Sequence, residues 1–204
     1  MGNREKLLLA ARECLERKGY TRTTARDVTQ AAGTSLAAIG YHFGSTEALL
    51  NAALHQAMEE WGARLERTVG DVAGRPSSPI ERFELVWARI VASFEDDRAL
   101  WTVLSEMMVQ AQHVPDLREA LTASMAEGRA GLAEIFGDVV APGDPANARL
   151  VGALCQTLLT GLVMHWLIDP ERAPASNEIT EALRLLAGGP GGPSGPGGRG
   201  LGSA

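Results

Sequence analysis

The spacing of apolar residues constrains the fold of this chain more than any other feature of its sequence. Between Gly and Pro breakers, apolar residues recur with the 3.6-residue period of an α-helix, and strand-like alternation is not found. The pattern predicts helices at about residues 3–18, 24–32, 35–43, 46–69, 80–96, 98–112, 116–136, 146–168 and 177–187. We therefore expect an all-α fold.

Two short predicted helices lie near the N-terminus, at 24–32 and 35–43, and a tight turn at Gly33 joins them. Thr24, with Asp27 three residues later, is an Asp variant of the capping box that marks a helix start. Two short helices joined by a Gly-containing turn predict a helix-turn-helix motif. In that motif the second helix enters the major groove of DNA with its N-terminal residues near the base edges.

The second short helix does not have the composition of a core helix. Small residues, Ala37 and Gly40 among them, precede the bulkier Tyr41 and His42. The small residues allow a close approach to the groove floor, and Tyr41 and His42 reach phosphates, which fix register rather than sequence. Leu36 and Ala37 are placed to touch thymine methyl groups.

Charge is divided unevenly along the chain. Residues 1–50 contain seven Lys/Arg and five Asp/Glu, a net charge of +2, whereas the whole chain carries −6 and the remainder therefore −8. A mildly basic end on an acidic body is expected when only that end meets a polyanion such as DNA.

The segment from about Arg4 to Leu54 resembles, without gaps, the DNA-binding head of the tetracycline-repressor (TetR) family of one-component regulators. The matching residues are Ala10-Ala11, Gly19-Tyr20, Thr23-Thr24, Val28, Ala32-Gly33, Ser35, Tyr41-His42-Phe43 and Ser45-x-Glu47-x-Leu49-Leu50. Three positions depart from the family pattern: Thr29 stands in place of Ala, Gly40 in place of Tyr or Asn, and Thr46 in place of a phosphate-binding Lys. The loss of that Lys leaves one backbone contact per subunit in question.

The resemblance implies a homodimeric, ligand-responsive transcriptional regulator, most often a repressor, that binds a palindromic operator on double-stranded DNA. The residues expected to contact DNA are Thr23, Thr24, Arg26, Ser35, Leu36, Ala37, Gly40, Tyr41, His42 and Thr46. The resemblance also implies a pocket in the body for a small apolar or amphipathic effector. Its expected lining is Trp87, Phe94, Trp101, Met108, Gln110 and Trp166.

The predicted helix at 146–168 is apolar nearly all round, so it must be covered on more than one side. The resemblance implies that the last two helices pair with those of a second subunit in a four-helix bundle. The residues expected at this dimer interface are Leu150, Leu154, Leu158, Leu162, Ile179, Leu183 and Leu186. The alternative is that these residues pack only within the monomer.

The sequence predicts three regions. A helix-turn-helix DNA-binding domain is expected at 1–46, a helical regulatory and dimerisation domain at 47–187, and a disordered Gly/Pro-rich tail at 188–204. No uninterrupted apolar run approaches the ~20 residues that span a bilayer. We therefore expect a cytoplasmic protein without a membrane partner.

The sequence does not favour catalysis or metal binding. No nucleophile, base and orienting residue can be assembled from spacing, so an enzyme is not expected. The histidines of the body share no metal-ligand spacing, and Cys14 and Cys155 lie far apart without a Cys-x-x-Cys pattern. We expect neither a metal nor a cofactor.

Other functions remain open at this point. A regulator of this class could activate transcription or answer a protein signal. The body could be an all-α enzyme or a ligand carrier with a borrowed head, and a nucleoid-type protein would bind DNA without specificity. Sequence-selective binding to a duplex separates these alternatives from a regulator.

Overall fold

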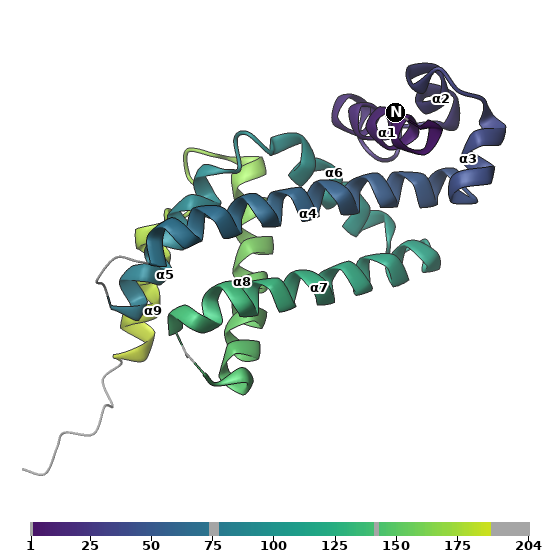
Figure 1. The fold of residues 1–204 in the computed structure, drawn as a ribbon. Helices are drawn as coiled ribbons and strands as arrows, with labels where there is room; N and C mark the ends of the chain where they lie inside the picture. The colour runs from purple at the N-terminus through teal and green to yellow at the C-terminus, as the bar shows by residue number, and fades with distance from the viewer. Residues whose placement is uncertain (1, 74–77, 141–142, 189–204) are drawn as a thin grey trace, which may run out of the picture.

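The described part of the chain is helical throughout, which confirms the expected all-α fold (Figure 1). The computed structural model describes residues 2–73, 78–140 and 143–188. The helices are α1 (Asn3–Lys18), α2 (Ala25–Ala32), α3 (Leu36–Phe43), α4 (Thr46–Ala73), α5 (Pro79–Ala92), α6 (Arg98–Gln110), α7 (Pro115–Val140), α8 (Pro145–Ile168) and α9 (Ser176–Ala187). The tail expected at 188–204 lies outside the described residues from 189 onward.

Several helix ends follow from local chemistry. The capping box predicted at Thr24 and Asp27 is present, because each residue's side chain bonds the other's backbone N–H. Helix α5 begins at Pro79 rather than 80, since Ser78 caps it through the N–H of Glu81 and Pro at the first helical position needs no N–H partner. The same helix ends at Ala92 rather than 96, and turns occupy 93–97.

Helices α1 to α3 form a small head at one end of the molecule, and α4 runs from the head along the length of the body (Figure 1). With 28 residues, α4 is about 42 Å long at 1.5 Å per residue. One apolar core joins α1 to α3 with the start of α4 and with parts of α6 and α7. The head therefore packs against the body through more than its covalent link.

A second core fills the body and contains most of its aromatic side chains. Phe83, Trp87 and Phe136 meet there with ring centroids 5.2 to 5.9 Å apart. Phe94 lies 5.6 Å from both Trp101 and Trp166, again between ring centroids. These contacts hold α5 to α8 together around the site described below.

Helix α8 is long and apolar enough by length and composition to span a bilayer, with a mean hydropathy of 1.6 over its most apolar window. A core helix of a water-soluble protein can have the same properties. Here α8 packs along α7 and buries residues that include Gly152, Cys155 and Trp166 in the core. Helix α8 is therefore part of the core of the body.

Candidate DNA-binding surface and ligand cavity

Helix α3 exposes one face and buries the other. Tyr41 is 86% exposed and Leu36 is 55% exposed, and Ala37 and Gly40 are also exposed. Ile39 points the opposite way and is only 3% exposed. The Leu36, Ala37 and Tyr41 side chains are thus open to solvent, and their contact with DNA stays a prediction.

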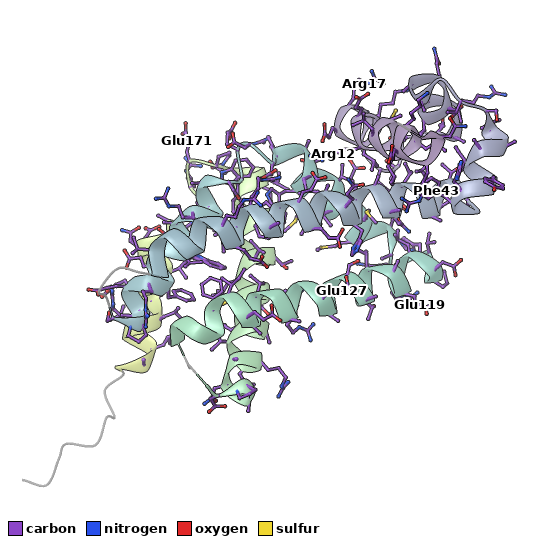
Figure 2. The ribbon with its side chains drawn as sticks, viewed as in Figure 1. Arg12, Arg17, Phe43, Glu119, Glu127 and Glu171 are labelled. Atoms are coloured by element: carbon purple, nitrogen blue, oxygen red, sulfur yellow. The ribbon has the colours of Figure 1, made fainter. Side chains whose placement is uncertain are left out.

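The C-terminal end of α3 is fixed by its neighbours. His42 and Phe43 are half-buried, and the Tyr41 and His42 rings lie edge to face with centroids 4.9 Å apart. The Arg4 guanidinium lies over the Phe43 ring, 5.3 Å from its centroid. Phe43 lies near the junction of α3 and α4 (Figure 2). A helix anchored at one end presents its outer face in a defined orientation.

The start of α2 is held by charge as well as by its cap. The Lys18 ammonium lies 2.6 Å from a carboxylate oxygen of Asp27, and the Thr24 hydroxyl donates to the other oxygen at 2.8 Å. Lys18 and then Thr24 lower the pKa of Asp27 to about 2. Asp27 therefore stays ionised and fixes the helix start, while Thr24 and Arg26 remain exposed beside it.

The burial of Thr23 disagrees with the expectation that this residue contacts DNA. Its side chain is buried, and its hydroxyl lies 2.7 Å from the carbonyl oxygen of Gly19 and 3.2 Å from that of Cys14. The hydroxyl is thus occupied within the head and cannot reach a phosphate without breaking these bonds. We assign Thr23 to fixing the turn between α1 and α2.

The caps of α3 and α4 differ from each other. Ser35 occupies the N-cap position of α3, but its side chain makes no capping hydrogen bond, so the hydroxyl is exposed and unused by the helix. Ser45 caps α4 by accepting from the N–H of Ala48 at 3.0 Å. Thr46, the first residue of α4, is half-buried beside this cap.

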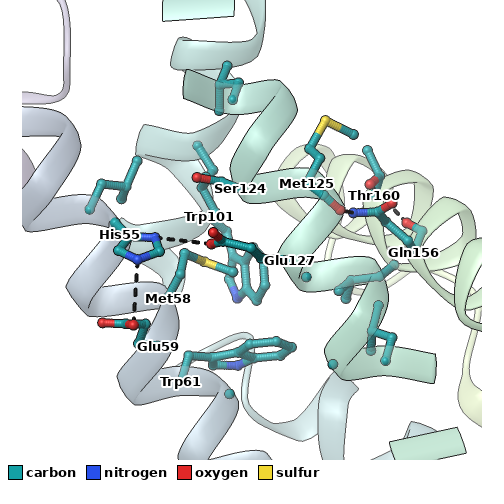
Figure 3. Close-up of a pocket in the computed structure, with 18 of the residues that line it drawn as sticks. His55, Met58, Glu59, Trp61, Trp101, Ser124, Met125, Glu127, Gln156 and Thr160 are labelled. Atoms are coloured by element: carbon teal, nitrogen blue, oxygen red, sulfur yellow. Dashed lines mark hydrogen bonds and ion pairs between the residues drawn. The ribbon is translucent and has the colours of Figure 1, made fainter. Parts of the chain in front are cut away.

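The body contains a cavity of about 560 Å³ between α4, α6, α7 and α8 (Figure 3). Its wall is mostly apolar and rich in Met, with Met58, Met107, Met108, Met125 and Met164 contributing. A space of this size with few polar groups is typical of small-molecule sites. Flexible thioether side chains also adapt to ligands of different shape.

Two tryptophans form the buried side of the cavity. The rings of Trp61 and Trp101 lie edge to face with centroids 5.0 Å apart, and the residues are 6% and 4% exposed. The Trp61 indole N–H donates to the hydroxyl of Ser93 at 3.1 Å, which fixes the ring. An apolar ligand group would meet an aromatic wall here.

Every formally charged residue that lines the cavity is a glutamate, namely Glu59, Glu66 and Glu127. His55 lies between two of them, with its Nε2 3.5 Å from Glu59 and its Nδ1 3.8 Å from Glu127 (Figure 3). Arg129 is not part of the lining, and its Nε–H donates to the side-chain oxygen of Gln156, a lining residue, at 2.9 Å. Among the described lining residues, neither Lys nor Arg occurs, so the formal charge of the lining is negative.

The cavity only partly matches the lining expected from the sequence. Trp101 and Met108 line it, whereas Gln110, Trp87, Phe94 and Trp166 do not. Trp87 and Phe94 are completely buried, because their rings fill the second core rather than face a space. The expected lining did not include His55, Met58 or the three glutamates.

Part of the expected dimer interface is exposed. Leu150, Leu154 and Leu186 are 58%, 46% and 81% exposed, and Ile168 and Leu185 add to the same two helices. Leu162 is buried within the monomer at 4% exposure, and Leu158, Ile179 and Leu183 pack partly against the second core. The outward-facing residues leave an apolar surface on α8 and α9.

The cysteines are buried and reduced. Burial raises the pKa of Cys155 to about 12, so its thiol stays protonated and unreactive at neutral pH. Within residues 2–73, 78–140 and 143–188, no group of His, Cys, Asp or Glu side chains is arranged to hold a metal ion.

Two family profiles match the chain. Residues 7–53 match the profile described as "Bacterial regulatory proteins, tetR family", and residues 79–188 match "BetI-type transcriptional repressor, C-terminal". The second match alone covers more than half of the 204 residues. No curated protein matches the chain.

Solved structures share the fold over nearly the whole chain. GusR of Salmonella enterica has a TM-score of 0.66 and 20% identity, covering 90% of this chain and 94% of its own. The fatty acid degradation regulator FadR of Bacillus halodurans has a TM-score of 0.64 and 16% identity, with coverages of 93% and 97%. A TetR transcription regulator of Haloarcula marismortui has a TM-score of 0.58 and 20% identity, with coverages of 91% and 94%.

Proposed function

Because the chain belongs to the TetR family of bacterial transcriptional regulators, we propose that it is a homodimeric repressor that a small molecule releases from a near-palindromic operator. The family makes it a DNA-binding regulator and not an enzyme. Repression, the dimer and release by a ligand are the parts proposed. The exposed small-residue face of α3 is the observation that supports operator binding most strongly.

Two features support the proposed dimer: the single recognition helix of each chain and the apolar surface on α8 and α9. One chain offers a single recognition helix, and two-fold protein symmetry selects two-fold DNA sites. Leu150 and Leu154 on α8, with Leu185 and Leu186 on α9, are exposed and would be covered by the same helices of a second copy. A monomer would leave this surface in water.

Within the proposed site, Leu36 and Ala37 touch base edges and Tyr41 and His42 contact phosphates. Gly40 leaves room for the backbone of α3 to approach the groove, since a Cβ built there meets nothing within 4 Å. Arg26 and the N-terminus of α2 lie where a phosphate would be favoured. Ser35 and Thr46 stay in the proposed contact set with exposed or half-buried hydroxyls.

The cavity supports an apolar effector that carries a positive charge. A carboxylate or phosphate on the ligand would face Glu59 and Glu127 without a Lys or Arg side chain in the lining to balance it. A cation would be attracted by the same carboxylates while its apolar part meets Trp61 and Trp101. We therefore propose an organic cation as effector, rather than an acid.

Tetraphenylphosphonium and tetraphenylborate test this proposal because they match in size and shape and differ in the sign of their charge. We expect the cation to bind at least about tenfold more tightly, since a tenfold ratio needs only ~1.4 kcal/mol. Glu127→Gln should weaken the cation several-fold. Glu134→Gln, an exposed α7 residue outside the lining, is the matched control. Isothermal titration measures both ions, and equal affinities would contradict the charge assignment.

A further inference from the structure

Helix α6 packs against the head and also lines the cavity. Val103 and Met107 pack in the same core as α1, whereas Leu104 and Met108 line the cavity together with Met107. The helix has 13 residues and one continuous set of backbone hydrogen bonds. A displacement of its cavity face is therefore also a displacement of the face that touches the head.

One side chain of α6 hydrogen-bonds directly to the head. The Glu106 carboxylate accepts from the backbone N–H of Tyr20 at 2.7 Å and from that of Thr21 at 3.4 Å. Across the part of the chain that the structure describes, no other α6 side chain bonds to the head in this way. Successive N–H groups of a turn form a concavity that binds anions.

The turn between α1 and α2 is shaped around this carboxylate. Gly19 has φ +80°, and a Cβ built on it would lie 2.6 Å from one Glu106 oxygen. The Tyr20 hydroxyl donates to the side-chain oxygen of Asn51 on α4 at 3.1 Å, and Asn51 itself lines the cavity. The turn thus meets both α6 and α4, and it leads within four residues into the cap of α2.

We propose that Glu106 positions the DNA-binding head against the body and transmits a displacement of α6 to it. Helix shifts of about 1–2 Å are common in switching proteins, and a shift of that size takes a 2.7 Å contact out of hydrogen-bond range. The two recognition helices of a dimer must enter grooves about 34 to 36 Å apart. If each head is held less firmly against its body, the distance between the two recognition helices of the dimer is no longer fixed.

The experiment compares the unchanged chain with Glu106→Ala, Glu106→Gln and Glu119→Ala. Glu119 is an exposed acid on α7 and controls for the loss of one negative charge (Figure 2). The probes are a duplex obtained by selection from random sequences, the same duplex with one or two base pairs inserted between its half-sites, and a single half-site. Fluorescence anisotropy gives each affinity.

We expect Glu106→Ala to bind the selected duplex about tenfold more weakly and to lose less affinity than the unchanged chain when the spacing is altered. Its affinity for the half-site should stay within about twofold, because α3 itself is untouched. Glu106→Gln keeps an acceptor and should recover part of the loss, and Glu119→Ala should match the unchanged chain. Faster amide exchange at Tyr20 and Thr21 in Glu106→Ala would accompany this pattern.

Two results overturn the positioning role. One is an unchanged spacing profile in Glu106→Ala, and the other is an equal loss on the half-site, which would indicate damage to the head. The inference rests on the proposed function, and the two fail in different ways. If the unchanged chain selects no duplex, the proposed function fails before any variant is compared and the positioning role fails with it.

Discussion

Replacing Ala37 by Glu is expected to weaken binding to every DNA duplex by at least about 100-fold. Ala37 is exposed in the first turn of α3, and a carboxylate there would face the phosphates and base acceptors of the groove. Like charges placed together in an interface cost several kcal/mol, and 100-fold corresponds to ~2.7 kcal/mol. Gel-shift or anisotropy titrations on the selected duplex and on unrelated duplexes measure the effect.

The matched control is Ala92→Glu, because Ala92 is exposed at the end of α5 and receives the same added charge. It should leave duplex affinity within about twofold. Both variants should unfold like the unchanged chain, since neither side chain is buried. A Glu at position 37 that left affinity within threefold would place the groove-facing side of α3 elsewhere.

Replacing Gly152 by Ala is expected to lower the free energy of unfolding by about 2 kcal/mol. A Cβ at Gly152 would lie 2.7 Å from the Ala133 Cβ and 2.7 Å from the Arg129 carbonyl oxygen, so α7 and α8 must move apart. Overpacking of this kind typically costs ~1–3 kcal/mol. Because the stability of the proposed dimer would depend on concentration, urea unfolding should be compared at one protein concentration.

Gly131→Ala on α7 provides a control with the opposite sign. A Cβ there meets nothing within 4 Å, and Ala is favoured over Gly inside a helix by about 1 kcal/mol. The chain should therefore gain stability from Gly131→Ala and lose it from Gly152→Ala. Equal effects of the two substitutions would show that α7 and α8 do not approach as closely as the structure has them.

The head could be predicted in detail because its signals are local. Thr24 and Asp27 lie three residues apart in one capping box, and Gly33 marks the turn by its left-handed conformation at φ +61°. The exposed and buried faces of α3 follow from helical period, as Tyr41 and Ile39 show, because residues two positions apart lie on different sides of a helix. The burial of Thr23 could not be predicted in this way. Its hydroxyl bonds to the carbonyls of Cys14 and Gly19, which belong to the preceding helix and its cap.

The cavity was predicted less well because a cavity is what side chains leave unfilled. Trp87 and Phe94 were expected to line it for their size, and the same size makes them fill the core completely. His55 and Glu127 meet across α4 and α7, although 72 positions separate them in the chain. Glu106 likewise reads as an ordinary surface acid until α6 is placed beside the turn at Tyr20.

Selection of bound sequences from random duplexes, followed by sedimentation of the complex, tests directly whether two chains bind one operator. We expect enrichment of a near-palindromic sequence, two chains bound per duplex, and no displacement by a scrambled competitor at equal concentration. One chain that binds a single half-site with full affinity would contradict the dimer. Displacement by the scrambled duplex as readily as by the selected one would contradict operator recognition and favour a protein that binds DNA without specificity.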